Sequence, residues 1–382
     1  MRVVIIGAGL GGLALAQALR GAGVDVSVHE RDAGVEYRFQ GYRIGLGGPG
    51  WEALHRCLPE RLHPLLHASS GELAGPGRLV DEQLVLQGLD ESASLAQSYE
   101  ANVVDRHVLR HLLLAGLGDV VHFGARLTGF AELPGGTVRA TFADGSSEIA
   151  DVLAGADGIG SAVRSQLAGP AERIGTGVRG VIGRTPMTER FAALVPGRGT
   201  MVAGPGLNLF LGKMPFRRPP QEAAAELAPE VFLPATASYL RWVMLLPPEN
   251  TVDLAADDGA GALEFVGDLV AGWHPDLREL VRLADAHNSS LGELVYVPPV
   301  DPWESGRATL LGDAAHTMLP SGGMGGNTAL RDAADLADRL IAGGDVEAAI
   351  ADYEREMLAV SRPLVLASRQ ALDGLMGLGA AR

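Results

Sequence analysis

The sequence is poor in cysteine and in positive charge, and it has no long apolar run. Its 382 residues include one cysteine, Cys57, so an internal disulfide framework is excluded and a reducing compartment is indicated. Acidic residues outnumber basic ones, 46 to 31, and the formal net charge is −15. A nucleic-acid-binding protein needs a basic face, and no apolar run reaches the length of a membrane span. We therefore expect a cytoplasmic protein that binds neither nucleic acid nor a membrane.

Glycine, in contrast, is abundant, with 52 residues, several of them clustered in two short segments. The first segment follows the apolar run 3–6, where Gly7, Gly9 and Gly12 have the spacing G-x-G-x-x-G, and a second β-rich run then ends in Glu30. A dinucleotide-binding unit consists, in this order, of a strand, a glycine turn, a helix, a second strand and an acidic residue. The alternative interpretation, a secretion signal, also fits an uncharged N-terminal run but does not account for the acidic residue in register.

Each part of this unit has a physical role. The first glycine permits a tight turn, the second lets the backbone approach a pyrophosphate, and the third lets the helix pack on the strand. The helix N-terminus, which begins at Leu10, offers unpaired N–H groups to an anion. Glu30 would accept hydrogen bonds from a ribose diol, and Arg31 follows it directly. The glycine spacing does not distinguish FAD from NAD.

The second glycine segment, residues 311–327, reads as a buried strand, a glycine-rich loop and a long helix beginning at Asn327. Here the sequence resembles the FAD-dependent monooxygenases of the para-hydroxybenzoate hydroxylase type, whose pattern is G-D-A-x-H, Pro, G-x-G-x-N and Asp. The matching residues are Gly312, Asp313, Ala314, His316, Pro320, Gly323, Gly325, Asn327 and Asp332. The D-G motif of that family is matched at Asp157 and Gly158, with Gly160 where a histidine is common, and its helical arginine is matched by Arg106.

The resemblance implies an FAD-dependent monooxygenase in which FAD is bound tightly but non-covalently. No second G-x-G-x-x-G is present, and the resemblance implies that NADPH or NADH binds only transiently, without a Rossmann domain of its own. O₂ would add at flavin C4a, and the hydroperoxide would oxygenate a hydrophobic small molecule, aromatic or polyketide-like, by hydroxylation, epoxidation or Baeyer–Villiger insertion. Two alternatives remain open: a flavin-dependent reductase or dehydrogenase of related fold, and a non-catalytic ligand-binding protein. A monomer or a homodimer is expected.

The fold class implied is α/β, a Rossmann-like FAD-binding domain with an inserted, mostly antiparallel β substrate domain. Residues 102–117 read as a helix that starts near Asp105, a plausible N-cap, and residues 207–214 and 239–246 read as strands. Strands near the N-terminus, near 150 and near 310 are expected to share one sheet. The FAD-binding domain is predicted to comprise residues 1–75, 101–170 and 295–345, the substrate domain residues 76–100 and 171–294, and a C-terminal helix residues 346–382.

Candidate site residues follow from the motifs and from charge. Asp313 suits the ribityl hydroxyls, Arg106 suits a phosphate or ribose oxygen, and the helix at Asn327 would direct its dipole at the N1 side of reduced flavin. The predicted cofactor-binding set is Gly7, Gly9, Leu10, Gly12, Glu30, Arg31, Arg38, Arg43, Arg106, Asp157, Asp313, Pro320, Gly323, Gly325, Gly326 and Asn327. Phe210, Trp242 and Met244 are candidates for the substrate pocket, although core packing explains each equally well. No side chain is predicted to be a general acid or base.

Histidines at helical spacing raise the question of a metal. His63 and His67, and likewise His107 and His111, are four residues apart, but the sequence shows no third ligand near either pair. No H-E-x-x-H motif is present, so we expect no metal site. His316 is expected to hydrogen-bond locally within its loop.

Overall fold

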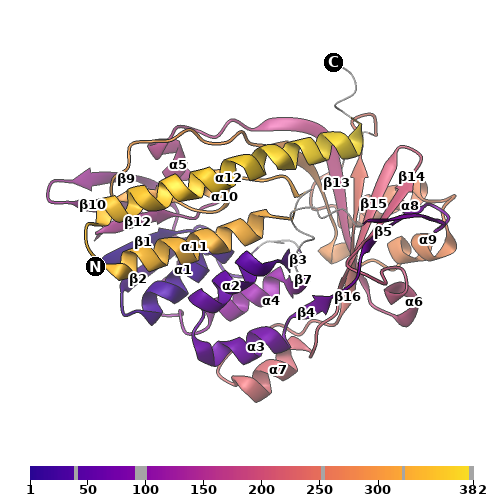
Figure 1. Cartoon of the computed structure of the whole chain (residues 1–382), viewed down its shortest axis with the longest axis horizontal. Coiled ribbons are helices and arrows are strands. Elements are labelled where there is room, and N and C mark those ends of the chain that lie inside the picture. Colours follow the sequence, from indigo (N-terminus) through magenta and orange to yellow (C-terminus); the bar gives the residue numbers. More distant parts are fainter. Residues whose placement is uncertain (38–41, 91–100, 251–253, 321–322, 378–382) are drawn as a thin grey trace.

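The structure is a computed structural model that describes residues 1–37, 42–90, 101–250, 254–320 and 323–377. Its two main parts are a parallel sheet covered by helices and a larger, mostly antiparallel sheet (Figure 1). Within the described residues, no helix combines the length and the apolar character needed to cross a membrane.

The parallel sheet has five strands in the order β18-β12-β1-β2-β8. Their bounds are β18 (Ala308–Leu310), β12 (Val152–Gly155), β1 (Arg2–Ile6), β2 (Asp25–Glu30) and β8 (Val121–Phe123). All four pairings are parallel. Parallel sheets are covered on both faces, which explains why these strands read as continuous apolar runs. The predicted association of strands near the N-terminus, near 150 and near 310 is confirmed.

Two helices cover this sheet and pack closely on each other. α1 (Leu10–Gly21) lies against α11 (Gly325–Ala342). A Cβ on Gly11 would lie 3.2 Å from the backbone oxygen of Ala329, so the small residue permits the close approach of the two helices. The N-termini of both glycine-rich helices thereby reach the same part of the molecule.

The larger sheet has seven strands in the order β17-β13-β16-β15-β14-β5-β6. Their bounds are β17 (Ser290–Tyr296), β13 (Ile174–Pro186), β16 (Tyr239–Leu246), β15 (Leu207–Met214), β14 (Thr200–Gly204), β5 (Gly77–Asp81) and β6 (Leu86–Asp90). Only the β14–β5 pair is parallel. The bounds predicted for β15 and β16 are confirmed, because both segments are apolar runs that end at turn-forming residues.

The bounds of the remaining elements complete the chain. The helices are α2 (Gly48–Cys57), α3 (His63–Ala68), α4 (Arg106–Leu114), α5 (Ala162–Leu167), α6 (Glu189–Ala192), α7 (Pro220–Leu227), α8 (Gly259–Leu269), α9 (Pro275–Arg282), α10 (Asp313–His316) and α12 (Val346–Met376), with 3-10 turns at Glu60–Leu62 and Ala286–Asn288. The smaller strands are β3 (Arg43–Leu46), β4 (Gly71–Leu73), β7 (Ala101–Asp105), β9 (Leu127–Leu133), β10 (Thr137–Phe142) and β11 (Ser147–Ala150).

The start of α4 agrees with the prediction. This helix begins at Arg106, directly after the N-cap predicted at Asp105, because residues 101–105 pair as β7 with β3 and β4. Asp105 is the N-cap, as predicted, and accepts hydrogen bonds from two backbone N–H groups of the first turn. The C-terminal helix α12 continues through Pro363 and ends at Met376, within the segment 346–382 given for it above.

Helix α12 connects the two parts of the structure (Figure 1). It packs on α11 and β18, beside the parallel sheet, while Leu372 near its other end lies in an apolar cluster with Val178 and Leu245 of the larger sheet. A helix that contributes buried residues to both parts restrains their relative movement.

The core of the larger sheet generates the first prediction. Trp242 is fully buried against residues of α8 and α9, and its indole N–H donates to the hydroxyl of Thr185 at 3.2 Å. Trp242→Ala should lower the free energy of unfolding by about 3–5 kcal/mol, because it leaves a large cavity. Phe232, 70% exposed, is the control; Phe232→Ala should change that free energy by less than about 0.5 kcal/mol. Denaturant unfolding measures the free energy of unfolding of both variants. A loss below about 1 kcal/mol in Trp242→Ala would contradict the placement of Trp242 in the core of the larger sheet.

Candidate functional site

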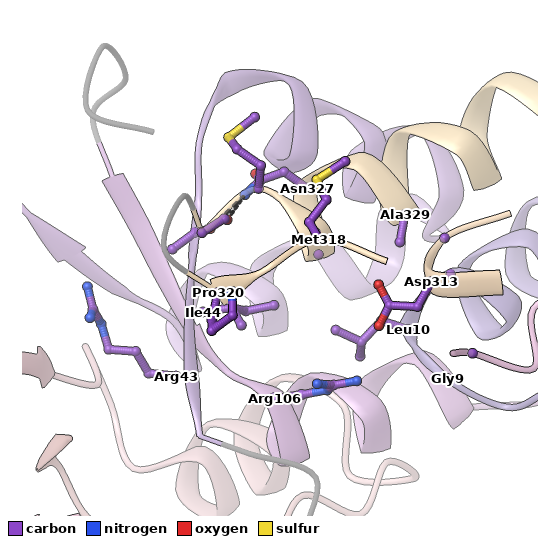
Figure 2. A pocket seen from close by; sticks show the side chains of 18 of the residues that line it. Gly9, Leu10, Arg43, Ile44, Arg106, Asp313, Met318, Pro320, Asn327 and Ala329 are labelled. Atoms are coloured by element: carbon purple, nitrogen blue, oxygen red, sulfur yellow. Dashed lines mark hydrogen bonds between the residues drawn. The ribbon is translucent and has the colours of Figure 1, made fainter. Parts of the chain in front are cut away.

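One cavity of about 1170 Å³ lies where the two parts of the structure meet, and both glycine-rich segments line it. Ligand pockets typically measure about 300–1,000 Å³, so this one is large enough for an extended ligand. In Figure 2, Gly9 and Asp313 lie at one side of the cavity and Arg43 at the opposite side, with Pro320 between them. Segments far apart in the sequence therefore line one cavity.

The first glycine segment forms a close backbone turn. Gly7 has φ +107°, and a Cβ there would lie 2.3 Å from the backbone oxygen of Ala156. A Cβ on Gly12 would lie 2.1 Å from the backbone oxygen of Gly7. At Gly9 no atom lies within 4 Å of such a Cβ, so this residue exposes its backbone to the cavity. Two of the glycines are thus required by packing, and the third leaves room for a ligand.

Glu30 lies at the end of β2 and holds this turn. Its carboxylate accepts hydrogen bonds from the backbone N–H groups of Ala8, at 2.8 Å, and Asp32, at 2.9 Å. The buried Arg110 donates from Nε to the backbone oxygen of Ala8 at 2.9 Å. Glu30 also lines the cavity, so its remaining acceptor positions can meet a ligand. Arg110 was not predicted, because nothing in the sequence links α4 to the glycine turn.

The N-termini of α1 and α11 both border the cavity. Gly9 and Met324 are their N-cap residues, and among the described residues no side chain caps the first turn of either helix. The unpaired N–H groups and the helix dipole together favour a negative charge at each of these two places. A ligand with two separated electronegative regions would suit this arrangement.

The second glycine loop is held in place by Asn327. Its side-chain amide donates to the backbone oxygens of Gly45, at 2.9 Å, and Gly323, at 3.1 Å, and its oxygen accepts from Gly47 N–H at 3.0 Å. Asn327 therefore joins the loop to β3 and α2. Asp313, at the start of α10, is exposed and faces the cavity (Figure 2), so its carboxylate can accept hydrogen bonds from a ligand.

Asp157 is engaged mainly by its own loop. Its carboxylate accepts from the hydroxyl of Ser161 at 2.5 Å and from Ala162 N–H at 2.7 Å. Burial raises the pKa of Asp157 despite these hydrogen bonds. Gly160, the departure from the family pattern, also lines the cavity, and a Cβ there would lie 3.9 Å from the guanidinium of Arg31. The missing side chain leaves this part of the cavity open.

The structure brings all but one of the predicted cofactor-binding residues to the cavity. The exception, Arg38, lies outside the described residues. The lining includes Gly7, Gly9, Leu10, Gly12, Glu30, Arg31, Arg43, Arg106, Asp157, Asp313, Pro320, Gly323, Gly325, Gly326 and Asn327. That these residues bind a cofactor remains a prediction.

Two arginines distinguish the opposite end of the cavity from the glycine-rich end. Arg43 of β3 and Arg241 of β16 line it together with Phe210. A Cβ on Gly212 would lie 2.2 Å from Nη1 of Arg43, so this glycine makes room for the guanidinium against the sheet. Burial, together with the nearby Arg241, lowers the pKa of Arg43 to about 10, and burial lowers that of Arg241. Among the described residues, no carboxylate forms an ion pair with either arginine.

Trp242 and Met244 do not line the cavity, which corrects their assignment as substrate-pocket candidates. Both are fully buried in the core on the α8 and α9 side of the sheet, whereas Arg241 on the same strand reaches the cavity. Neighbouring residues of a strand point to opposite faces, so the face that contains Arg241 excludes residues 242 and 244. The sequence could have indicated this alternation, because Arg241 is the one charged residue of β16.

His316 forms a hydrogen bond, as expected, but its partner Asp332 lies on α11 and not within its own loop. His316 is buried, and its Nε2 lies 2.5 Å from a carboxylate oxygen of Asp332, which also accepts from Gly312 N–H at 3.0 Å. Burial by itself would lower the pKa of His316, but the Asp332 carboxylate outweighs it and raises that pKa above 6.5. The pair thus connects α11 to the turn that begins the second loop.

This pair generates a pH prediction. Because folding raises the pKa of His316, the stabilisation of the folded state by protonated His316 is complete below the pKa of the unfolded state, about 6.5. This stabilisation declines as pH rises through the pKa of the folded state. The difference in unfolding free energy between the parent and His316→Gln should therefore shrink between about pH 6 and 9. In an Asp332→Asn background this dependence should disappear. A difference in unfolding free energy that stays constant with pH would contradict the pairing of His316 with Asp332.

Comparison with known proteins identifies the family that this chain resembles. Residues 297–368 match the model of an FAD binding domain, and residues 5–59 match an NAD(P)-binding Rossmann-like domain. The FAD-dependent urate hydroxylase of Klebsiella pneumoniae is 30% identical over 98% of this chain and 90% of its own length. An FAD-containing monooxygenase from Photorhabdus luminescens has a similar structure, with a TM-score of 0.82 and 30% identity, covering 99% of this chain and 100% of the other.

A third relative is longer. A dual O-methyltransferase/FAD-dependent monooxygenase of Cercospora beticola is 32% identical over 93% of this chain, which spans 44% of the fungal protein. The match thus extends along nearly the whole of the present chain and less than half of that relative. Together with the shared cavity and the two glycine segments that line it, these similarities show that the chain belongs to the FAD-dependent monooxygenases of the para-hydroxybenzoate hydroxylase type.

Proposed function

We propose that this protein is an FAD-dependent, NAD(P)H-consuming monooxygenase that acts on a hydrophobic small molecule carrying an acidic hydroxyl or carboxyl group. The observation that carries the proposal is the large cavity in which two glycine-rich segments meet an apolar end containing two arginines. The division into an FAD-binding domain and an inserted substrate domain, with the boundaries given above, is part of this proposal.

The glycine-rich end fits FAD. The N-terminus of α1 would receive the pyrophosphate, Glu30 a ribose diol, and Asp313 the ribityl hydroxyls. The N-terminus of α11 would stabilise the negative charge that the N1 side of the ring acquires on reduction. When bound, the flavin would accept hydride from NAD(P)H and activate O₂ at its C4a position. The chain's own contribution is to position the ring and to exclude water.

The opposite end fits a substrate that is mostly apolar but carries a negative charge. Phe210, Met201 and Leu319 provide apolar surface there. Arg43 and Arg241 would each gain a counter-charge on binding an ionised hydroxyl or carboxylate, which a guanidinium can hold through two hydrogen bonds. An ionised hydroxyl on an aromatic ring also makes that ring electron-rich and more easily oxygenated. The name of the Klebsiella relative, urate hydroxylase, refers to an anionic substrate and agrees with this proposal.

Purified protein tests the proposal directly. It should be yellow, release FAD on denaturation, and consume NADPH or NADH and O₂ faster when a phenolic or carboxylated aromatic compound is added. Stable-isotope O₂ should appear in the product. Full product yield without O₂ would instead support the reductase or dehydrogenase alternative. A protein that remains colourless after incubation with FAD would contradict the whole proposal.

The two arginines give a sharper prediction. Arg241→Gln should lower kcat/KM for a carboxylated or phenolic substrate by about 100-fold, because it removes a charge-assisted pair in a poorly solvated site. The FAD absorbance spectrum should not change. Lys213, on the neighbouring strand, does not line the cavity. Lys213→Gln is therefore the matched control and should leave kcat/KM within about twofold. Equal losses in both variants would show that general charge, not the cavity, is responsible.

A further inference from the structure

The structure supplies the third ligand that the sequence lacked for the histidine pair of α4. His107 and His111 lie one turn apart on this helix, and Glu36 approaches them from the segment that follows β2. A single carboxylate oxygen of Glu36 lies 3.0 Å from Nε2 of His107 and 3.0 Å from Nε2 of His111. The three potential ligand atoms all lie within 4.8 Å of one another.

This donor set has the chemistry of a zinc site. Two imidazole nitrogens and one carboxylate oxygen are common ligands of Zn²⁺, and such sites leave a fourth position for water. A tetrahedral zinc with bonds of about 2.0–2.1 Å holds its ligand atoms about 3.4 Å apart, so the observed separations of 3.0 Å from the carboxylate oxygen require only a small spreading. Both rings would then bind through Nε2 and carry their proton on Nδ1.

The surroundings leave the position accessible. Glu36 is 67% exposed at its side chain, His107 32% and His111 10%, so a cation can reach the three atoms from solvent. The ring of Phe232 lies edge-on to His111 at 5.3 Å and limits its movement. One ligand is nearly buried and the other two can adjust, which suits a cation that draws them together.

We propose that Glu36, His107 and His111 form a binding site for a divalent transition metal such as Zn²⁺. The site is separate from the large cavity, whose lining contains none of the three residues. It joins the start of α4 to the segment after Glu30, which are distant in sequence.

Arg110 gives such a metal a structural consequence. It lies between the two histidines in α4, donates from Nη1 to the backbone oxygen of Val35 at 3.0 Å, and holds the glycine turn through Ala8. A metal bound beside it would fix the segment 31–37 on α4. The bound form should therefore unfold at a higher temperature, because a ligand that binds only the folded state stabilises it.

Titration of the full-length protein with Zn²⁺, after treatment with a chelator and followed by calorimetry, tests the proposal. One equivalent should bind with a micromolar or lower Kd and raise the melting temperature. Glu36→Gln, His107→Gln and His111→Gln should each weaken binding by about 100-fold. Glu36 is well exposed, so its substitution does not threaten folding.

His67 provides the matched control. Its Nε2 lies 2.9 Å from Nε2 of His55, and in the described part of the chain no carboxylate contacts this pair. His67→Gln should leave the Zn²⁺ affinity within about twofold of the parent. Undiminished binding by Glu36→Gln, a loss confined to His67→Gln, or no saturable binding by the parent would each overturn the proposal.

Discussion

Two helix N-termini border the same cavity, and no side chain in the described part of the chain caps either of them. Much of the structure serves to hold these two N-termini in place. α1 and α11 each present unpaired backbone N–H groups to the cavity. Unsatisfied donors in a partly buried position are costly unless a ligand or water receives them. An extended cofactor with two electronegative regions satisfies both, and the glycines at the two turns allow it to approach the backbone.

The contacts around the cavity show how this arrangement is maintained. Gly11 permits α1 to lie close to the backbone of α11. Asn327 joins the second loop to β3 and α2, and the pair of His316 and Asp332 joins α11 to the turn at Gly312. These polar groups are committed to the protein itself, which makes them positioning residues. Exposed Asp313 and the backbone N–H groups are left to meet a ligand.

At the other end of the cavity, the strands of the larger sheet contribute residues both to the cavity and to the core. β15 and β16 turn one face to the cavity and the other to α8 and α9, so the same strands supply both Arg241 for a ligand and Trp242 for the core. Arg43 and Arg241 both line this end, and burial lowers the pKa of each guanidinium. Such charges persist most readily where an anion can join them.

The sequence by itself determined the local parts of this protein. The spacing of Gly7, Gly9 and Gly12, the acid at Glu30, the N-cap at Asp105 and the apolar segments of β15 and β16 are patterns set by neighbouring residues, and the structure contains them. Only the tertiary structure decided which face of β16 meets the cavity, that Arg110 holds the first glycine turn, and that Glu36 joins His107 and His111. These contacts join residues far apart in the chain, and their partners are chosen by how sheets and helices pack, which no local pattern specifies.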